Sequence, residues 1–406
     1  MRFMATLLPA VDESSPRYAG WRVVAACYLA AVCCWGFGLY GHGVYLTELT
    51  RLHGWSTALI SAGITGFYLC TAALVVFVGD AIERFGPRLV MLIGTCCFVC
   101  AIALLACINA LWQLYPVYLL MAVGAATMHV GAISTVVGLW FDRERPLAIS
   151  LALNGASSGG ILVTPPLVLA ITAYGFSRAI LGAMLLMAAV LLPAIVFWIK
   201  RPGVAAAKPD AAPAAAAWTR RSALRSTRFW CVAAPFALAL TAQVGFLVHQ
   251  IAILEPILGR AQAGFSVAAL TIMAILGRFG LGSFAGHLDM RRFASWSVAS
   301  QAAALLTLTA TNNPAALIAA CVLFGLSAGN LLTLPALVIQ REFEAASFAV
   351  LVGLSWAIFQ FTYAFGPGLV GVIRDATGTY TAPLILLAAL DLAAAALVLL
   401  RPRKLI

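Results

Sequence analysis

Long apolar runs alternate with short polar breaks over most of the chain. Each run approaches the roughly 20 residues that a helix needs to cross the hydrocarbon core of a bilayer. The pattern predicts an all-α membrane protein with twelve transmembrane helices. Six spans are expected at 21–46, 57–80, 88–109, 112–139, 146–172 and 177–199, and six more at 229–254, 265–287, 293–311, 315–338, 347–372 and 381–400.

The two sets of spans are separated by a polar segment, residues 200–228. It is rich in Ala and Pro, and its second part carries Arg220, Arg221, Arg225 and Arg228. This composition is typical of a loose connector, and its basic end suits anionic lipid headgroups. We therefore expect an N-terminal six-helix bundle at 1–199, a cytoplasmic linker at 200–228 and a C-terminal six-helix bundle at 229–406.

Composition and charge support a membrane location. Hydrophobic residues make up 63% of the 406 positions and charged residues only 10%, which excludes an ordinary soluble domain. Placing both termini and the 200–228 segment in the cytoplasm puts 20 of the 25 Lys and Arg residues there, as the positive-inside rule requires. The net charge of +11 therefore reports topology and gives no evidence for a nucleic-acid partner. We expect a multi-pass protein of the cell's inner membrane.

The two halves also share a pattern. Gly38 precedes His42 in the first span much as Gly245 precedes His249 in the seventh. Gly124 lies five residues before His129, and Gly325 lies five residues before Asn330. Such matches indicate a duplicated six-helix unit, which is common in transporters that rock around a site at mid-membrane.

The segment after the second span carries a motif, Gly79-Asp80-Ala81-Ile82-Glu83-Arg84-Phe85-Gly86-Pro87-Arg88. It resembles the signature loop between the second and third helices of the major facilitator superfamily, with Glu83 where Asp is usual. A shorter copy with Asp289 and Arg291 follows the eighth span. The resemblance implies a secondary transporter that works as a monomer, with a gating loop formed by Gly79, Asp80, Glu83, Arg84, Gly86 and Arg88 and by Asp289 and Arg291.

Within that superfamily, the chain resembles the monocarboxylate transporter and oxalate–formate antiporter branch. The resemblance rests on Gly20-Trp21, on Gly54-Trp55-Ser56, on 140–145 with the following Asn154-Gly155, and on Arg278 in the middle of the eighth span. Two positions depart from the branch. Ala274 stands where an acidic residue is frequent, and no lysine lies in a span, which disfavours a doubly charged substrate.

Arg278 is the main candidate for substrate binding. An arginine at mid-membrane costs at least about 2.5–3.5 kcal/mol on insertion scales, so it needs water or a partner. No acidic residue lies on the adjacent turns of its own helix. Because a guanidinium matches a carboxylate with two parallel hydrogen bonds, we expect the substrate to supply the negative charge. The alternative is a structural arginine that binds backbone carbonyls of another helix.

Other polar residues in the spans are weaker candidates. His42, His129 and His249 titrate in a range that would suit proton coupling, although each could equally be a neutral packing histidine. Asp391 is a further proton candidate, on a helix that is usually peripheral. Residues that could orient the oxygens of a substrate are Tyr45, Tyr68, Asn154, Asn330, Gln360 and Tyr363.

The sequence thus predicts proton-coupled uptake of small organic anions, with a small carboxylate, protons and the lipid bilayer as partners and no cofactor. The alternatives are an organic-anion exchanger or an effluxer of drugs or metabolites. A membrane enzyme or sensor is disfavoured because no span carries a metal-ligand cluster or a nucleophile with its base. Pro165-Pro166 and Gly366-Pro367-Gly368 are expected points of helix bending.

Overall fold

The computed structural model describes residues 13–15, 17–200, 218–284 and 289–400, and what it describes is almost entirely helical. One group of helices, here called the N-half (residues 17–200), contains α1 (Gly20–Trp35), a turn of π-helix (Gly36–Tyr40), α2 (Gly41–His53), α3 (Thr57–Phe85), α4 (Pro87–Leu105), α5 (Leu111–Thr127), α6 (Val130–Gly138), α7 (Arg145–Leu162), α8 (Thr164–Tyr174) and α9 (Phe176–Trp198).

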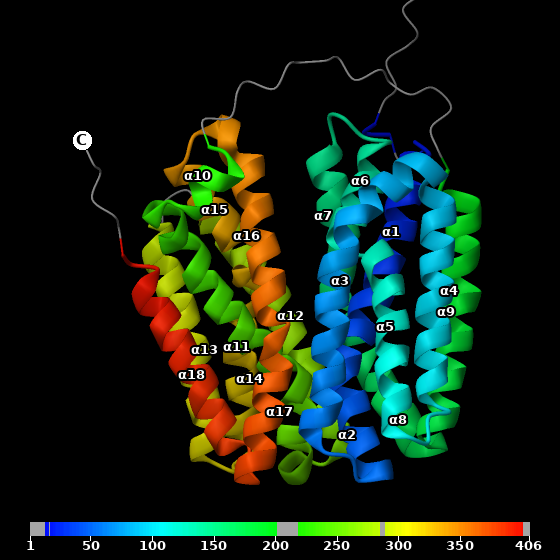
Figure 1. The fold of residues 1–406 in the computed structure, drawn as a ribbon, viewed down its shortest axis with the longest axis vertical. Helices are drawn as coiled ribbons and strands as arrows, with labels where there is room; N and C mark the ends of the chain where they lie inside the picture. The colour runs from blue at the N-terminus through cyan, green and yellow to red at the C-terminus, as the bar shows by residue number, and fades with distance from the viewer. Residues whose placement is uncertain (1–12, 16, 201–217, 285–288, 401–406) are drawn as a thin grey trace, which may run out of the picture.

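The second group, here called the C-half (residues 218–400), stands beside the first (Figure 1). It contains α10 (Arg220–Leu224), α11 (Thr227–Leu258), α12 (Arg260–Phe284), α13 (Met290–Ala310), α14 (Pro314–Leu331), α15 (Leu334–Glu342), a short 3₁₀ turn (Ala345–Ser347), α16 (Phe348–Tyr363), α17 (Phe365–Thr377) and α18 (Thr381–Leu397).

Several of these helices join end to end into longer rods. Ten rods among the described residues are long and apolar enough to cross a membrane. The helices α13, with 21 residues, and α18, with 17 residues, run beside them and complete a set of twelve. The prediction of an all-α membrane protein with twelve spans is confirmed.

The rods bend where the backbone hydrogen-bond ladder is weakened. The helices α7 and α8 meet at Val163, just before Pro165, and α16 and α17 meet at Ala364, just before Pro367. A proline has no N–H to donate to the residue four positions earlier, so the rod changes direction there. Both expected bending regions are therefore places where a helix ends and another begins.

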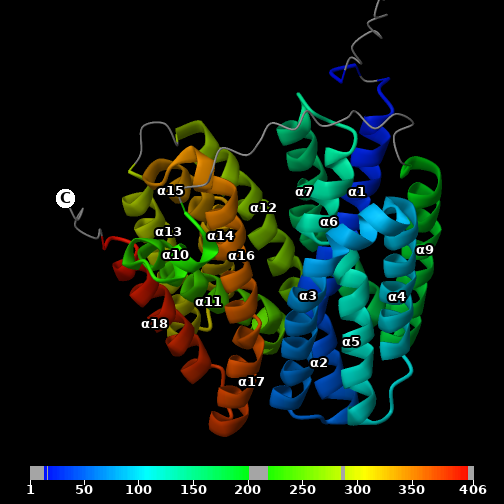
Figure 2. The ribbon, with the colours of Figure 1, turned by 45° about the horizontal axis from the view of Figure 1, so that its top comes forward.

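The helices run between two sides of the molecule. The first turn of α1 and the short helix α10 lie at the top of Figure 1, here called the linker side, and the opposite end is called the far side. The helix α18 rises from the far side toward the linker side. Figures 1 and 2 show that the ribbons of the two halves diverge toward the linker side. Arg84, Arg145 and Arg291 lie at helix ends on this side, which the positive-inside rule assigns to the cytoplasm.

Close helix packing in the C-half depends on glycine. A Cβ built on Gly277 of α12 would lie 2.2 Å from the carbonyl oxygen of Leu326, and one built on Gly329 of α14 would lie 1.8 Å from that of Ala274. These distances are far below van der Waals contact, so only glycine allows the backbones of α12 and α14 to approach so closely. This packing fixes the position of Arg278, one residue after Gly277.

Two segments differ from expectation. The expected loop at 79–88 is helical except at Gly86, because α3 continues to Phe85 and α4 begins at Pro87. Gly86 has φ of 90°, which reverses the chain in one residue.

Within the segment 200–228, residues from Trp218 onward pack on the C-half: Ala223 of α10 is buried, and the Trp218 ring contacts Phe343. Residues 201–217 lie outside the described residues.

Candidate functional site

Arg278 lies at the boundary between the two halves. Its Nη2 donates to Ser157 Oγ of α7 at 3.2 Å, and its Nε approaches the Gly329 carbonyl oxygen of α14 at 3.4 Å. One partner belongs to the N-half and the other to the C-half. Among the described residues, Arg278 makes no ion pair with an acidic side chain. Its charge is thus left for a ligand or water to neutralise.

Tyr40 is a neighbour of Arg278 that sequence reasoning missed. It is buried, and its phenol oxygen lies close enough to interact electrostatically with the guanidinium. Tyr40 ends the π-helical turn Gly36–Tyr40, which shifts the register of the rod between α1 and α2. Single π turns interrupt helices frequently at functional sites. The glycines at 36, 38, 41 and 43 were the available signal for this irregularity.

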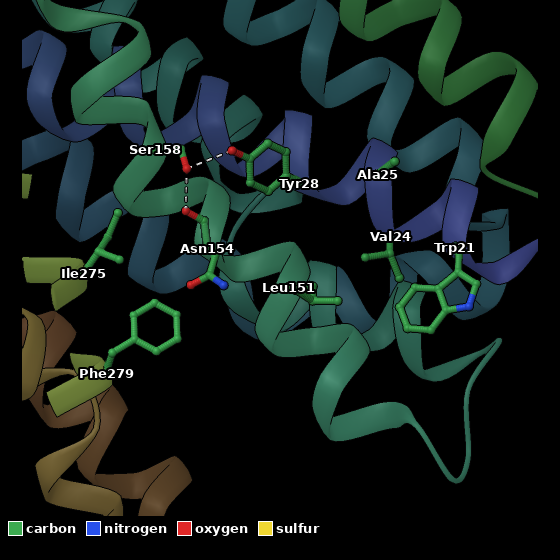
Figure 3. A pocket seen from close by; sticks show the side chains of 9 residues that line it. All are labelled: Trp21, Val24, Ala25, Tyr28, Leu151, Asn154, Ser158, Ile275 and Phe279. Carbon is green, nitrogen blue, oxygen red and sulfur yellow. Dashed lines mark hydrogen bonds between the residues drawn. The ribbon is translucent and has the colours of Figure 1, made fainter. Parts of the chain in front are cut away.

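A cavity of about 490 Å³ lies between α1 and α7 of the N-half and α12 of the C-half (Figure 3). The C-half contributes Ile275, which lies one turn before Arg278, and Phe279, which follows it. The remaining lining residues come from the N-half, namely Trp21, Val24, Ala25, Tyr28, Leu151, Asn154 and Ser158. Arg278 lies between Ile275 and Phe279 in the sequence of α12 but is not among the lining residues. A mostly apolar cavity with a few polar groups suits a small amphipathic ligand.

The polar groups of this cavity are held in place by one another. The Tyr28 hydroxyl donates to Ser158 Oγ at 2.8 Å, and Ser158 Oγ donates to the Asn154 carbonyl oxygen at 3.1 Å (Figure 3). The Asn154 side chain lies in the cavity wall. The structure therefore brings Asn154, a predicted substrate residue, to a cavity that Ile275 and Phe279 of α12 also line.

His42 lies apart from that cavity, inside the N-half. It is fully buried, and its ring centroid lies 4.7 Å from that of Phe67, 5.6 Å from that of Tyr68 and 5.5 Å from that of Tyr118. Neither ring nitrogen has a hydrogen-bond partner in the part of the chain that the structure describes, and the same holds for the hydroxyls of Tyr45, Tyr68 and Tyr118. Tyr68 extends this aromatic cluster to Tyr363 of the C-half, 5.6 Å away.

His249 has a different environment, although it occupies the matching place in the second half. Its Nε2 lies 3.1 Å from the Pro367 carbonyl oxygen and 3.3 Å from Ser61 Oγ of the N-half, and its Nδ1 lies 3.3 Å from the Tyr380 hydroxyl. Each ring nitrogen thus has a polar neighbour. His249 joins the halves, whereas His42 does not.

The other predicted residues are spread over the molecule. His129 precedes the first residue of α6 and stacks on Trp35 with ring centroids 5.5 Å apart. The Asn330 amide donates to the Leu326 carbonyl oxygen, and its side chain lines a separate groove inside the C-half. Gln360 is half-buried on α16. Asp391 is buried on α18, at the edge of the C-half that faces away from the N-half (Figure 1).

The contacts described here for the predicted gating residues each lie within one half. Arg88 Nε donates to the Ile199 carbonyl oxygen at 2.8 Å, and Arg84 lies over the ring of Phe85. Asp289 accepts from the backbone N–H of Arg291 and so caps α13. Arg291 pairs with Glu342 through two nitrogens, at 2.5 and 2.8 Å. Gly79 and Asp80 lie in the last turns of α3, and Glu83 is exposed there.

Contacts that join the halves at the far side were not predicted. Buried Glu48 of α2 pairs with Arg260, the first residue of α12, and also with Arg51 of its own helix at 2.6 Å. Asp375 of α17 accepts from the Ala58 backbone N–H at 2.8 Å and from the Ser56 hydroxyl at the start of α3. Acidic and basic residues at the ends of the far-side spans were the only signal in the sequence.

Comparison with known proteins identifies relatives along the whole chain. The family model of the Major Facilitator Superfamily matches residues 27–349. Human monocarboxylate transporter 11 is 27% identical over 97% of this chain and 86% of its own length. The crystal structure of the nucleoside transporter NupG superposes with a TM-score of 0.76 at 13% identity, covering 94% of this chain and 100% of that one. A bacterial homolog of the human lysosomal transporter Spinster, in an inward-facing and occupied conformation, gives 0.69 at 12% identity, covering 96% and 97%.

Proposed function

Because the chain belongs to the major facilitator superfamily of secondary transporters, we propose that it takes up small monocarboxylates together with protons across the cell's inner membrane. The observation that carries this proposal is Arg278, a guanidinium between the two halves whose described partners, Ser157 Oγ and the Gly329 carbonyl oxygen, are both uncharged. A carboxylate can replace these weak partners with two charge-assisted hydrogen bonds. The full-length similarity to monocarboxylate transporter 11 supports the same substrate class.

Binding would use groups from both halves. Arg278 of α12 holds the carboxylate, Tyr40 and Ser157 of the N-half offer hydroxyls beside it, and the apolar wall around Ile275 and Phe279 accepts the rest of the substrate. A ligand that touches both halves favours conformations in which they close around it. Substrate binding is thereby coupled to rocking of 1–199 against 229–406 about the 200–228 linker, with the gating residues limiting that motion at the linker side.

His249 is the best-placed of the four proton candidates. Its partner Ser61 belongs to the other half, so opening of the far side separates the two and exposes the imidazole to water. A proton taken up at that moment is carried until the linker side opens. His42 is enclosed by aromatic rings with no acidic neighbour among the described residues, where a charged imidazolium would be costly, and Asp391 lies on the peripheral helix α18.

Uptake by the purified protein in liposomes, driven by an inward proton gradient, tests the proposal. We expect Arg278→Ala to lower uptake of labelled lactate or pyruvate by about 10- to 100-fold, because a hydrogen-bonded charge contributes roughly 1.5–3 kcal/mol. Uptake by Arg278→Lys should be intermediate, since lysine keeps the positive charge but lacks the planar guanidinium that donates two parallel hydrogen bonds.

Arg221→Ala, at an exposed arginine of α10, is the matched control and should transport normally. Wild-type uptake in both Arg278 variants would refute the carboxylate assignment. Uptake that depends on a counter-substrate instead of the proton gradient would favour the exchanger alternative.

A further inference from the structure

A second groove lies wholly within the C-half and shares no lining residue with the first cavity. It has a volume of about 550 Å³ and runs between α12, α13 and α14. The helix α14 forms its floor, because glycines hold α12 against α14, and Ser297 of α13 lies 2.9 Å from Ser327 of α14, Oγ to Oγ. The walls are formed by Gly277, Gly280, Leu281, Phe293, Trp296, Ser300, Leu323, Leu326 and Asn330.

The rim of this groove is apolar and open to the surroundings of the protein. Trp296 is 78% exposed, and Leu323 and Leu326 of the floor helix are also exposed. A Cβ built on Gly280 would meet no heavy atom within 4 Å, so the groove is open at that point. In a chain that spans a membrane, an exposed apolar surface on a spanning helix meets lipid. The occupant of the groove therefore comes from the bilayer.

The linker-side end of the groove carries a positive charge. Arg292 lies four residues before Trp296 on α13, so both are on the same face of the helix, and Arg292 is one turn nearer to the linker side. Its side chain is 80% exposed, and its described ion pair, with Asp289, is long at 3.9 Å. An exposed guanidinium beside an interfacial tryptophan is the arrangement that meets a lipid headgroup.

We propose that this groove is a binding site for an anionic phospholipid of the linker-side leaflet. One acyl chain lies in the groove against Gly280 and Trp296, and the phosphate lies on Arg292. The stretch from Arg292 to Ser300 gives the groove a length of about 12 Å along α13, which accommodates the upper part of one acyl chain. The groove shares no lining residue with the first cavity, and Arg278 does not line it.

Gly280 allows a clean test. Gly280→Leu fills the groove without a clash at Cβ, and Gly182→Leu is its control, because Gly182 is an exposed helical glycine of α9 with equally open space around it. Leucine forms helix better than glycine, so both variants should melt at or above the wild-type temperature. Arg292→Gln removes the charge, and Arg178→Gln removes a comparable exposed charge near the start of α9, in the N-half.

The measurement is native mass spectrometry of the purified protein with added dioleoyl phosphatidylglycerol or dioleoyl phosphatidylcholine. The wild type should retain phosphatidylglycerol in preference to phosphatidylcholine. Arg292→Gln should reduce that preference by about fivefold, as expected for one basic residue at an anionic surface. Gly280→Leu should lower retention of both lipids, and the two control variants should match the wild type.

Wild-type lipid retention by Gly280→Leu would overturn the groove as the site of the acyl chain. An unchanged preference for phosphatidylglycerol in Arg292→Gln would overturn the assignment of the phosphate to that residue. If Gly280→Leu fails to melt cooperatively, Trp296→Ser replaces it, because this change removes the exposed wall without altering the helix packing.

Discussion

The two sides of the molecule hold their helices together in different ways. At the far side, Glu48–Arg260, the Asp375 contacts with the start of α3, and Ser61–His249 each join the N-half to the C-half. At the linker side, the bidentate Arg291–Glu342 pair connects α13 to α15 inside the C-half, and the Arg88 contact with Ile199 lies inside the N-half. Polar contacts therefore join the two halves at the far side, while these two linker-side contacts each stabilise a single half.

This difference has a consequence for alternating access. Opening the far side must break the contacts between the halves, whereas the contacts within each half can persist through the whole cycle. Variants that remove a contact between the halves should change the balance between conformations. Variants that remove a contact within one half should change the stability of the fold. A reporter at the far side distinguishes the two. Thr65 of α3 is suitable because its side chain packs against Gly368 of α17 across the interface.

The largest expected effect is that of Arg260→Ala. Glu48 is 3% exposed, and without Arg260 it keeps only the partly exposed Arg51 as its cationic partner. Breaking a buried ion pair costs about 3–5 kcal/mol, and because Arg260 is itself not fully buried we expect about 2–3 kcal/mol of the closed state to be lost. In a Thr65→Cys reporter whose ten native cysteines are replaced by alanine, labelling by a membrane-impermeant maleimide should accelerate about 30- to 150-fold.

Arg51→Ala is the control for this prediction. It removes the other cation that contacts Glu48, but Arg51 and Glu48 lie on the same helix, and Arg51 is 52% exposed. The labelling rate of Arg51→Ala in the Thr65→Cys reporter should stay within a few-fold of the rate of the reporter alone. If Arg260→Ala labels no faster than Arg51→Ala, the Glu48–Arg260 pair does not hold the far side closed.

A smaller effect is expected for Asp375→Asn. The carboxylate accepts from the Ala58 N–H and from the Ser56 hydroxyl, and the neutral amide keeps one acceptor oxygen for these two donors. Losing the charge of such a contact costs about 1.5 kcal/mol, so labelling at Thr65→Cys should accelerate about tenfold.

Glu255→Gln is the matched acid-to-amide control for Asp375. Glu255 pairs with Arg260 at 3.4 Å, but both residues belong to the C-half. We expect this variant to leave the labelling rate almost unchanged. Equal acceleration in the two variants would show that loss of negative charge near the far side, and not the contact between halves, controls opening.

The architecture could be predicted from the sequence because the lipid bilayer constrains which segments can span it. A helix that crosses a bilayer must be apolar over its whole length, so the spans and the break between the two sets appear directly as runs of residues. The motif at 79–88 and the mid-span Arg278 identified the family. The helical state of residues 79–85 was missed because a polar segment between two spans resembles a loop, whereas the positive φ of Gly86 alone makes the turn.

The contacts between the halves could not be predicted from the sequence, because they depend on the orientation of each helix about its own axis. His42 and His249 occupy matching places in the repeat, yet one faces the interior of its half and the other faces the opposite half. A π-helical turn immediately before His42 changes the rotation of that rod, and α11 continues through His249 as one long helix. Spacing in the sequence therefore located the two histidines but could not distinguish their environments.

Ser61→Ala, with the smallest expected effect, compares these two histidines directly. The change removes the N-half partner of His249 and leaves the contacts with Pro367 and Tyr380 in the C-half. A neutral hydrogen bond contributes about 0.5–1.5 kcal/mol, so labelling of Thr65→Cys should accelerate about two- to tenfold. His42→Phe should leave this rate unchanged, because the rings around His42 all belong to the N-half. If His42→Phe accelerated labelling as much as Ser61→Ala, both histidines would contribute to closure and the division between contacts within a half and contacts between halves would fail at this position.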